Sequence, residues 1–129
     1  MTGGMIIRDA HFPGRAPIDA YGNGGFRFAG MSHRGSILCL PSGIHGWEPA
    51  DPENLGEEDF ARVIAEAAEV EVLLVGMGRD LRRLPAALRQ ALRDAGLSSD
   101  PMSTGSAVRT YNVLLAEDRA VAAALVAVE

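Results

Sequence analysis

The sequence of 129 residues is long enough for one domain, and with 47% hydrophobic residues it can bury a core without a disulfide or a metal. Twelve basic and seventeen acidic residues give a net charge of −5, which argues against binding to nucleic acid or to anionic lipid. All twelve basic residues are Arg, so the chain lacks a lysine for a Schiff base or for the phosphate loop of nucleoside triphosphatases.

The start of the chain predicts a protein without a targeting or membrane segment. Arg8 and Asp9 follow the first apolar residues too closely for a signal peptide, and no stretch approaches the roughly 20 apolar residues of a membrane span. Cys39, the single cysteine, lies in an apolar run, where we expect a buried and unreactive thiol. These features favour a cytoplasmic protein.

The first half of the sequence is typical of β-structure. Residues 26–28 alternate between Phe and Arg, and residues 36–40 form a short apolar run, so both segments predict strands. The glycines in residues 22–25 predict a turn. Residues 30–35 predict a hairpin connection between the two strands, and residues 51–54 a loop.

The second half predicts helices that alternate with strands. Apolar residues spaced by three and four predict helices over residues 60–67 and 81–92. A compact run rich in β-branched residues predicts a strand over residues 70–75, and the short segment over residues 97–102 could be another. A further helix is expected after the second of these strands, with Thr104 as its N-cap.

The tail, residues 121–128, suits a helix by its alanine content and a strand by the alternation of its outer residues. We expect a strand, because a helix would merge with the preceding one into an uncapped helix of unusual length. The resulting order of elements predicts a single α/β domain over residues 1–129, with a mostly parallel central sheet and helices on its faces.

A Gly-x-Gly turn, residues 76–78, follows the strand at residues 70–75. Ligands of open α/β sheets bind beyond the carboxyl ends of the strands, where glycine permits close backbone approach. The third glycine of the dinucleotide fingerprint is missing, because position 81 is Leu. A tight turn into a helix is therefore the first interpretation and a ligand-binding loop the second.

The densest polar cluster lies in residues 102–119. Buried polar side chains need partners, so these residues either cap neighbouring loops, which is the first interpretation, or point into a pocket. Glu117 could pair with Arg119 or with Arg109. For a pocket between the glycine turn and the Thr104 helix, the candidate ligand-binding residues are Gly76, Met77, Gly78, Met102, Thr104, Thr110, Tyr111, Asn112, Glu117 and Arg119.

Five arginines predict a basic stripe opposite the leucine side of the helix over residues 81–92, which Gly96 would end. Such a stripe could dock an acidic protein partner, although a solvated helix face gives the same pattern. The candidate partner-binding residues are Arg79, Arg82, Arg83, Arg89 and Arg93.

Other residues that could carry chemistry give weaker signals. His11, His33 and His45 are far apart and have no partner at ligand spacing, so we expect surface or turn histidines and neither a metal nor a cofactor. The chain has no Gly-x-Ser-x-Gly elbow, which argues against an α/β-hydrolase. Trp47 could anchor an interface or cover an edge of the core.

Four segments together resemble a known family. Residues 104–112 carry the pattern Thr-x-x-Ala-x-x-Thr-Tyr-Asn, and residues 73–78 match a strand followed by a Gly-x-Gly turn. Residues 21–26 and 41–47 resemble the N-terminal half of the same family. The family includes the mitochondrial respiratory complex I assembly factor 3 and has an uncharacterised bacterial and archaeal branch. The sequence departs from the pattern at Asp118, where we expect Gly between Glu and Arg.

The resemblance implies a three-layer α/β domain with an added N-terminal β-hairpin layer, and it does not imply an enzyme. Two functions follow from the residues and the resemblance together. The first is a non-enzymatic assembly or interaction factor, for which respiratory membrane complexes are the candidate clients. The second is a small-ligand-binding protein or enzyme with a pocket beside the glycine turn. The missing lysine, catalytic triad and metal ligands favour the first.

Overall fold

The first strands of the chain form a small antiparallel sheet in the computed structural model, which describes residues 12–129. This outer sheet consists of β1 (Ile18–Gly22), β2 (Gly25–Phe28) and β3 (Met31–Arg34). Asn23–Gly24 and Ala29–Gly30 connect the strands, and all four residues have positive φ angles. Two such residues in a row match a hairpin turn to the right-handed twist of the strands.

The predicted turn at residues 22–25 is confirmed, but the hairpin connection predicted over residues 30–35 is wrong. Residues 31–34 are themselves a strand, β3, which pairs with β2. Met31 is its single large apolar residue and the inward-facing position 33 is a histidine, so the segment lacks a visible hydrophobic alternation.

The remaining strands form a central five-stranded sheet. They are β4 (Ser36–Leu40), β5 (Gly43–Trp47), β6 (Val72–Gly76), β7 (Ser98–Met102) and β8 (Val121–Leu125), in the spatial order β5-β4-β8-β6-β7. Strand β6 is parallel to β7 and β8, whereas β4 is antiparallel to β5 and β8. The central sheet is therefore mixed and not mostly parallel as predicted. The two-residue link between β4 and β5 permits only an antiparallel hairpin, and the pairing of β4 with the distant β8 adds a second antiparallel pair.

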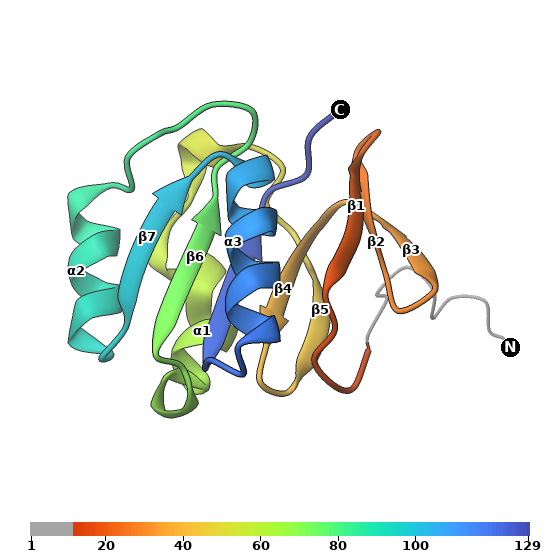
Figure 1. Ribbon diagram of the computed structural model, residues 1–129. Coiled ribbons are helices and arrows are strands. Elements are labelled where there is room, and N and C mark those ends of the chain that lie inside the picture. The colour runs from red at the N-terminus through yellow and green to blue at the C-terminus, as the bar shows by residue number, and fades with distance from the viewer. Residues whose placement is uncertain (1–11) are drawn as a thin grey trace, which may run out of the picture.

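Two layers cover the central sheet (Figure 1). On one face lie α1 (Ala61–Ala65), α2 (Ala86–Asp94) and the short 3-10 turns around α1; on the other lie α3 (Thr104–Ala116) and the outer sheet. Those turns are η2 (Pro52–Asn54), η3 (Glu57–Phe60) and η4 (Ala67–Glu69). The helix predicted over residues 60–67 is thus a broken helical segment with Phe60 and Val63 buried.

Alternating side chains of the central strands supply both cores. In β6, Leu73 and Val75 pack towards α1 and α2, whereas Leu74 packs towards α3. The strand predicted over residues 121–128 is present as β8 but ends at Leu125. Its Ala122, Ala123 and Ala124 are fully buried in the middle of the sheet. Small residues there allow the layers on both faces to approach closely.

The helix predicted over residues 81–92 begins only at Ala86. The proline at position 85 disfavours helical geometry in the residue before it, and Leu81 is 71% exposed in the preceding loop. The C-terminal end of α2 is as predicted. Gly96 has a φ of +89°, and Leu97 N donates to Leu92 O at 3.0 Å, which forms a Schellman motif.

The close contact at Gly76 predicts a clear effect of substitution. A Cβ atom at Gly76 would lie 3.0 Å from Thr104 Cα and 3.0 Å from Leu125 Cδ2. We expect Gly76→Ala to lower the free energy of unfolding by about 1–3 kcal/mol, the usual cost of overpacking. Gly56→Ala is the matched control, because its Cβ would meet nothing within 4 Å, and we expect a change within about 0.5 kcal/mol. Urea denaturation with equal midpoints for the two variants would contradict this packing.

Candidate functional site

Thr104 joins the ends of two central strands to the start of α3. Its hydroxyl accepts a hydrogen bond from Gly78 N at 3.0 Å and donates one to Val126 O at 2.7 Å. Its own N–H donates to Gly78 O at 2.8 Å. The predicted proximity of the glycine turn and Thr104 is therefore confirmed.

The predicted role of Thr104 as N-cap is wrong. The N-cap is Ser103, whose hydroxyl accepts a hydrogen bond from Ser106 N at 3.2 Å. Thr104 already lies inside the helix, and its side chain is fully buried against the strand ends. A sequence with Ser and Thr in succession offers two equally good caps, and here tertiary contacts recruit the second hydroxyl.

Open space lies on the outer side of the glycine turn. Gly76, Met77, Gly78 and Thr104 are buried, and Met77 and Gly78 also border a hollow of about 320 Å³. The hollow is bordered by Arg79, Asp80 and Arg82 and by the tail residues 126–129. Of the ten candidate ligand-binding residues, Met77 and Gly78 border this hollow.

Tyr111 and Asn112 fasten the outer sheet to α3. The Tyr111 hydroxyl donates to Ala16 O at 3.4 Å. The Asn112 amide binds both backbone groups of Ile18: Nδ2 donates to Ile18 O and Oδ1 accepts from Ile18 N, each at 2.9 Å. These contacts correspond to the first interpretation of the cluster, in which polar side chains satisfy neighbouring backbone.

The other cluster residues do not gather around the glycine turn. Met102 is the exception: it pairs with Gly76, and its carbonyl accepts a hydrogen bond from Met77 N at 2.7 Å. Thr110 is half-buried, while Glu117 and Arg119 are exposed beyond the far end of α3. The helix has 13 residues and therefore a length of about 20 Å. Arg119 Nε binds Glu71 Oε1 at 3.2 Å, in place of the predicted pair with Glu117.

The end of α3 accommodates the departure from the family pattern. Asp118 has a φ of +59°, and Arg119 N donates to Leu114 O at 3.0 Å. The helix thus ends in a Schellman motif with Asp in the left-handed position that glycine usually takes. Asp tolerates this conformation better than most residues with a Cβ atom.

The five candidate partner-binding arginines are all exposed, but they do not share one helix. Arg79, Arg82 and Arg83 lie in the loop before α2, and Arg89 and Arg93 lie on α2. The expectation of one stripe is wrong because α2 begins after Pro85. Arg82 Nη1 binds Glu53 Oε2 at 2.9 Å, whereas the structure gives the other four no ion pair with residues 12–129.

Cys39 and Trp47 are both buried. Burial raises the pKa of the Cys39 thiol to about 12, so the thiol stays neutral at physiological pH. Burial likewise raises the pKa of Tyr111, which lies beside Cys39. Trp47 covers the core: its Nε1 donates to Asp59 O at 2.8 Å, and its ring meets Phe60 edge-on at 5.4 Å.

The histidines correct another expectation. His33 and His45 are buried strand residues, not surface or turn residues, and His11 lies outside the described residues. Within residues 12–129, no group of three His, Cys, Asp or Glu side chains could hold a metal ion. No helix of this part of the chain is long and apolar enough to cross a membrane.

His45 belongs to a polar cluster with Ser42 and Glu66. The Ser42 hydroxyl donates to Glu66 Oε2 at 2.6 Å and lies 2.8 Å from His45 Nε2, while Ser42 N donates to Glu66 Oε1 at 3.0 Å. In a catalytic triad the imidazole stands between the serine and the carboxylate. Here the serine stands in the middle and donates its hydrogen bond to the carboxylate, so the cluster fastens the β4–β5 turn to the end of α1.

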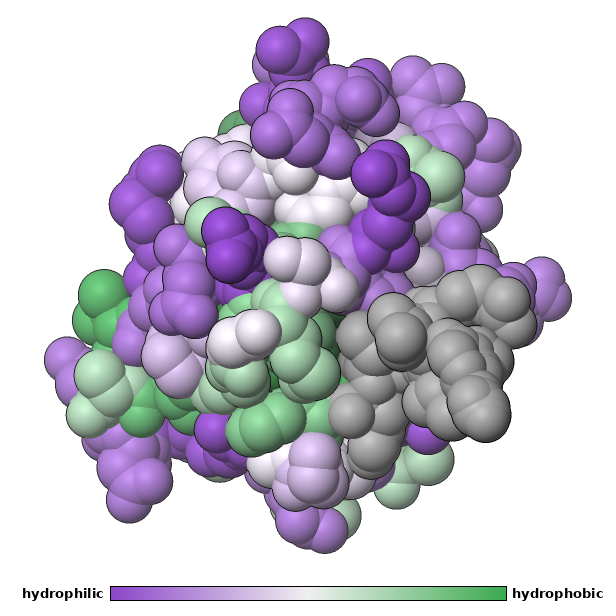
Figure 2. Space-filling view, turned by 90° about the vertical axis from the view of Figure 1, so that its right-hand side faces the viewer, coloured by the Kyte–Doolittle hydropathy of each residue, from purple (hydrophilic) through white to green (hydrophobic). Residues whose placement is uncertain are grey.

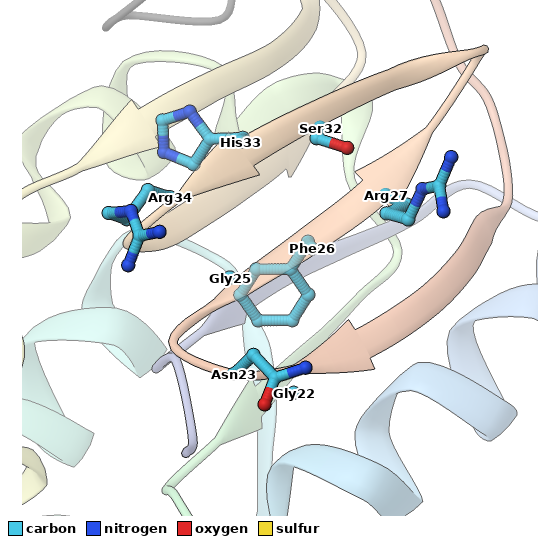
Figure 3. A pocket seen from close by; sticks show the side chains of 8 residues that line it. All are labelled: Gly22, Asn23, Gly25, Phe26, Arg27, Ser32, His33 and Arg34. Atoms are coloured by element: carbon cyan, nitrogen blue, oxygen red, sulfur yellow. The ribbon is translucent and has the colours of Figure 1, made fainter.

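Sequence reasoning missed a second hollow, on the outer sheet (Figure 3). Its volume is about 690 Å³, and its polar side chains come from Asn23, Arg27, Ser32 and Arg34. The alternation of residues 26–28 could have placed Arg27 on the outward face, but β3 was not expected as a strand. We call this feature the outer-sheet hollow.

Comparisons with known proteins identify the family. The family model described as a protein of unknown function (DUF498/DUF598) matches residues 18–126. The chain belongs to this family. The resemblance to the family of assembly factor 3 is confirmed as well, because NADH dehydrogenase (ubiquinone) 1 alpha subcomplex assembly factor 3 of Mus musculus is 30% identical over 122 residues. That match covers 95% of this chain and 66% of the mouse protein, so this chain spans slightly less than two thirds of it.

Bacterial relatives match over nearly their full lengths. An uncharacterised protein of Rhodobacter capsulatus is 45% identical over 121 residues, which are 94% of this chain and 92% of that one. The crystal structure of a protein described as an outer membrane protein from Bartonella henselae is 66% identical, with a TM-score of 0.89. The match covers 92% of this chain and 100% of the Bartonella chain. Relatives this similar share the mixed α/β fold described above.

The contacts of Thr104 predict a ranking of substitutions. Thr104→Ala removes a buried hydroxyl and leaves Gly78 N and Val126 O without their partner, so we expect a loss of about 2–4 kcal/mol in the free energy of unfolding. Ser103→Ala removes only the helix cap and should cost about 1 kcal/mol. Thr104→Ser keeps the hydroxyl, so its loss in the free energy of unfolding should be smaller than that of Thr104→Ala. Chemical denaturation would refute the bridging role if Ser103→Ala were the more damaging change.

The Asn112 contacts predict a local effect. Asn112→Asp keeps the shape of the side chain but loses the donor to Ile18 O, and it brings two acceptors to a carbonyl. We expect amide hydrogen exchange at Ile18 and its neighbours in β1 to accelerate at least about tenfold, while exchange in β6 stays unchanged. Uniform acceleration in both strands would instead indicate global destabilisation and argue against a local clamp.

Proposed function

We propose that this protein is a non-enzymatic assembly or interaction factor that helps a respiratory membrane complex to mature. The observation that carries the proposal is the use of the family signature. The side chains of Thr104, Tyr111 and Asn112 form hydrogen bonds with the protein's own backbone. The signature therefore maintains the fold, and a partner would be recognised by other residues on the surface. The relationship to an assembly factor for NADH dehydrogenase supplies the class of client.

The surface proposed for the partner is the arginine cluster. Arg79, Arg83, Arg89 and Arg93 are exposed guanidinium groups without an ion pair among the described residues, on a chain of net charge −5. Such a local excess of positive charge attracts and orients an acidic partner, and the attraction weakens as salt screens it. In this proposal the protein acts in the cytoplasm and needs neither nucleic acid nor a metal or cofactor.

Gene deletion and complementation test the proposal. Deleting the gene in the organism of origin should lower the amount of assembled NADH dehydrogenase complex several-fold on native gels, and the wild-type gene should restore it. The double variant Arg83→Glu, Arg89→Glu should fail to restore it, because the reversed charges repel the acidic partner. The matched control is Arg62→Glu, Arg109→Glu, which reverses two exposed arginines elsewhere and should complement. An unchanged complex level after deletion would overturn the assembly role.

A second candidate function rests on the hollow beside Gly78. It holds about 320 Å³ and places Arg79 and Arg82 near Asp80, which suits a small polar ligand. Gly78 has a φ of +96°, and a Cβ there would lie 3.5 Å from Pro52 Cγ at the border of the hollow. If a folded Gly78→Ala variant fails to complement while Arg83→Glu, Arg89→Glu succeeds, the ligand-binding function replaces the first proposal.

A further inference from the structure

The outer-sheet hollow follows from the register of the three outer strands. Gly22 lies opposite Gly25, and Gly25 lies opposite Arg34, so one cross-strand row carries a single side chain. In the next row Arg27 lies opposite Ser32. The side chains of Phe26 and His33 point into the core and are buried. Gly22 and Gly25 therefore add no side chain to the hollow, and the arginines of the two rows stand at its sides.

The two arginines of the hollow have no partner within the protein. The structure gives neither Arg27 nor Arg34 a hydrogen bond or an ion pair with any described side chain, in contrast to Arg82 and Arg119. Both are exposed. The outer sheet lies on the side of the molecule that Figure 2 shows, and the upper half of that view is mostly hydrophilic. Glu129 lies beside Gly24, but its carboxylate forms a salt bridge with neither of them. An unpaired guanidinium fork is suited to a carboxylate from outside.

The positions of the arginines favour two separate anionic groups. Figure 3 shows the side chains on opposite sides of Gly25 and Phe26, directed away from each other. Arg27 and Arg34 are diagonal neighbours across β2 and β3, a relationship that separates two residues by about 7–8 Å. In an extended peptide, side chains at positions i and i+2 share a face and are about 7 Å apart. The backbone positions of two acidic residues at alternate positions thus match those of the two arginines. Because the two guanidinium groups diverge, two separate carboxylates suit them better than one small anion.

We propose that the outer-sheet hollow binds an extended acidic segment of a partner protein, with Asp or Glu at alternate positions facing Arg27 and Arg34. No side chain of Gly22 or Gly25 obstructs the backbone of the segment, and Ser32 and Asn23 offer hydrogen bonds at the border of the hollow. This surface is separate from the arginine cluster in the loop before α2 and on α2. It adds the chemistry of a partner segment to the proposed function, but the binding can be measured independently of any role in assembly.

Fluorescence anisotropy with a defined peptide tests the proposal. The probe is a fluorescein-labelled ten-residue peptide in which Glu alternates with Val and Thr, titrated with the full-length protein at low salt. The double variant Arg27→Gln, Arg34→Gln should weaken binding at least about tenfold, because each substitution removes charge-assisted hydrogen bonds. The control double variant Arg62→Gln, Arg109→Gln removes equal charge from exposed sites elsewhere and should bind within about twofold of wild type. Circular dichroism verifies that both variants are folded.

Peptide controls and mapping sharpen the result. A peptide of the same composition in which pairs of adjacent Glu residues are separated by Val and Thr has no two Glu at positions i and i+2. It should bind several-fold more weakly, since neighbouring residues of a strand face opposite sides. Amide chemical shifts of the wild-type protein should change at residues 25–34 when the alternating peptide is added. Equal weakening by both double variants, or equal affinity for both peptides, overturns the proposal. Competition by millimolar inorganic phosphate without any peptide binding would instead reveal a small-anion site.

The two proposals can fail separately. If the alternating peptide binds as expected but deletion of the gene leaves the respiratory complex unchanged, the acidic-segment site stands and the assembly role falls. If deletion lowers the complex and Arg27→Gln, Arg34→Gln still complements while binding no peptide, the hollow binds such a segment for another purpose. Absence of peptide binding to the wild-type protein overturns the hollow proposal alone.

Discussion

The contact between Thr104 and the glycine turn is the constraint on which the arrangement of both sheets depends. A single buried hydroxyl is bonded to Gly78 and to Val126, which follow neighbouring parallel strands. Because Gly76 has no side chain, α3 can start directly against those strand ends. Seven and eight residues later, two helical turns along, Tyr111 and Asn112 then reach the outer sheet. Helix α3, which is fixed at its first turn, thereby sets the position of the outer sheet beside it.

Much of the second half of the fold could be predicted from the sequence, because there local pattern and tertiary structure agree. The apolar run of β6 predicts a strand, and Gly96, which has a positive φ, predicts a helix end. The start of α2 could have been predicted too, since Pro85 argues against helix before it. The antiparallel pairing of β4 with β8 could not be predicted, because it depends on contacts between distant segments that the periodicity of the sequence does not encode.

The candidate site was predictable only in part, and the reason is physical. The sequence indicates that Thr104, Tyr111 and Asn112 are special, but a polar side chain that bonds backbone and one that lines a pocket have the same sequence signature. Burial decides between the two, and burial is a property of the packed molecule. Arg27 and Arg34 illustrate the reverse case: each is an unremarkable surface arginine until the register of β2 and β3 sets them around two glycines.

The double hydrogen bond of Asn112 has a consequence for how this protein meets other copies of itself. Ile18 lies in β1, one of the two edge strands of its sheet, and an edge strand presents free backbone groups that can recruit a strand from another molecule. The side-chain amide occupies the two groups of Ile18 as a neighbouring peptide unit would. The helix thus shields that border of the sheet against intermolecular strand addition, and a chain that lost the amide would gain an aggregation-prone border as well as a loose layer.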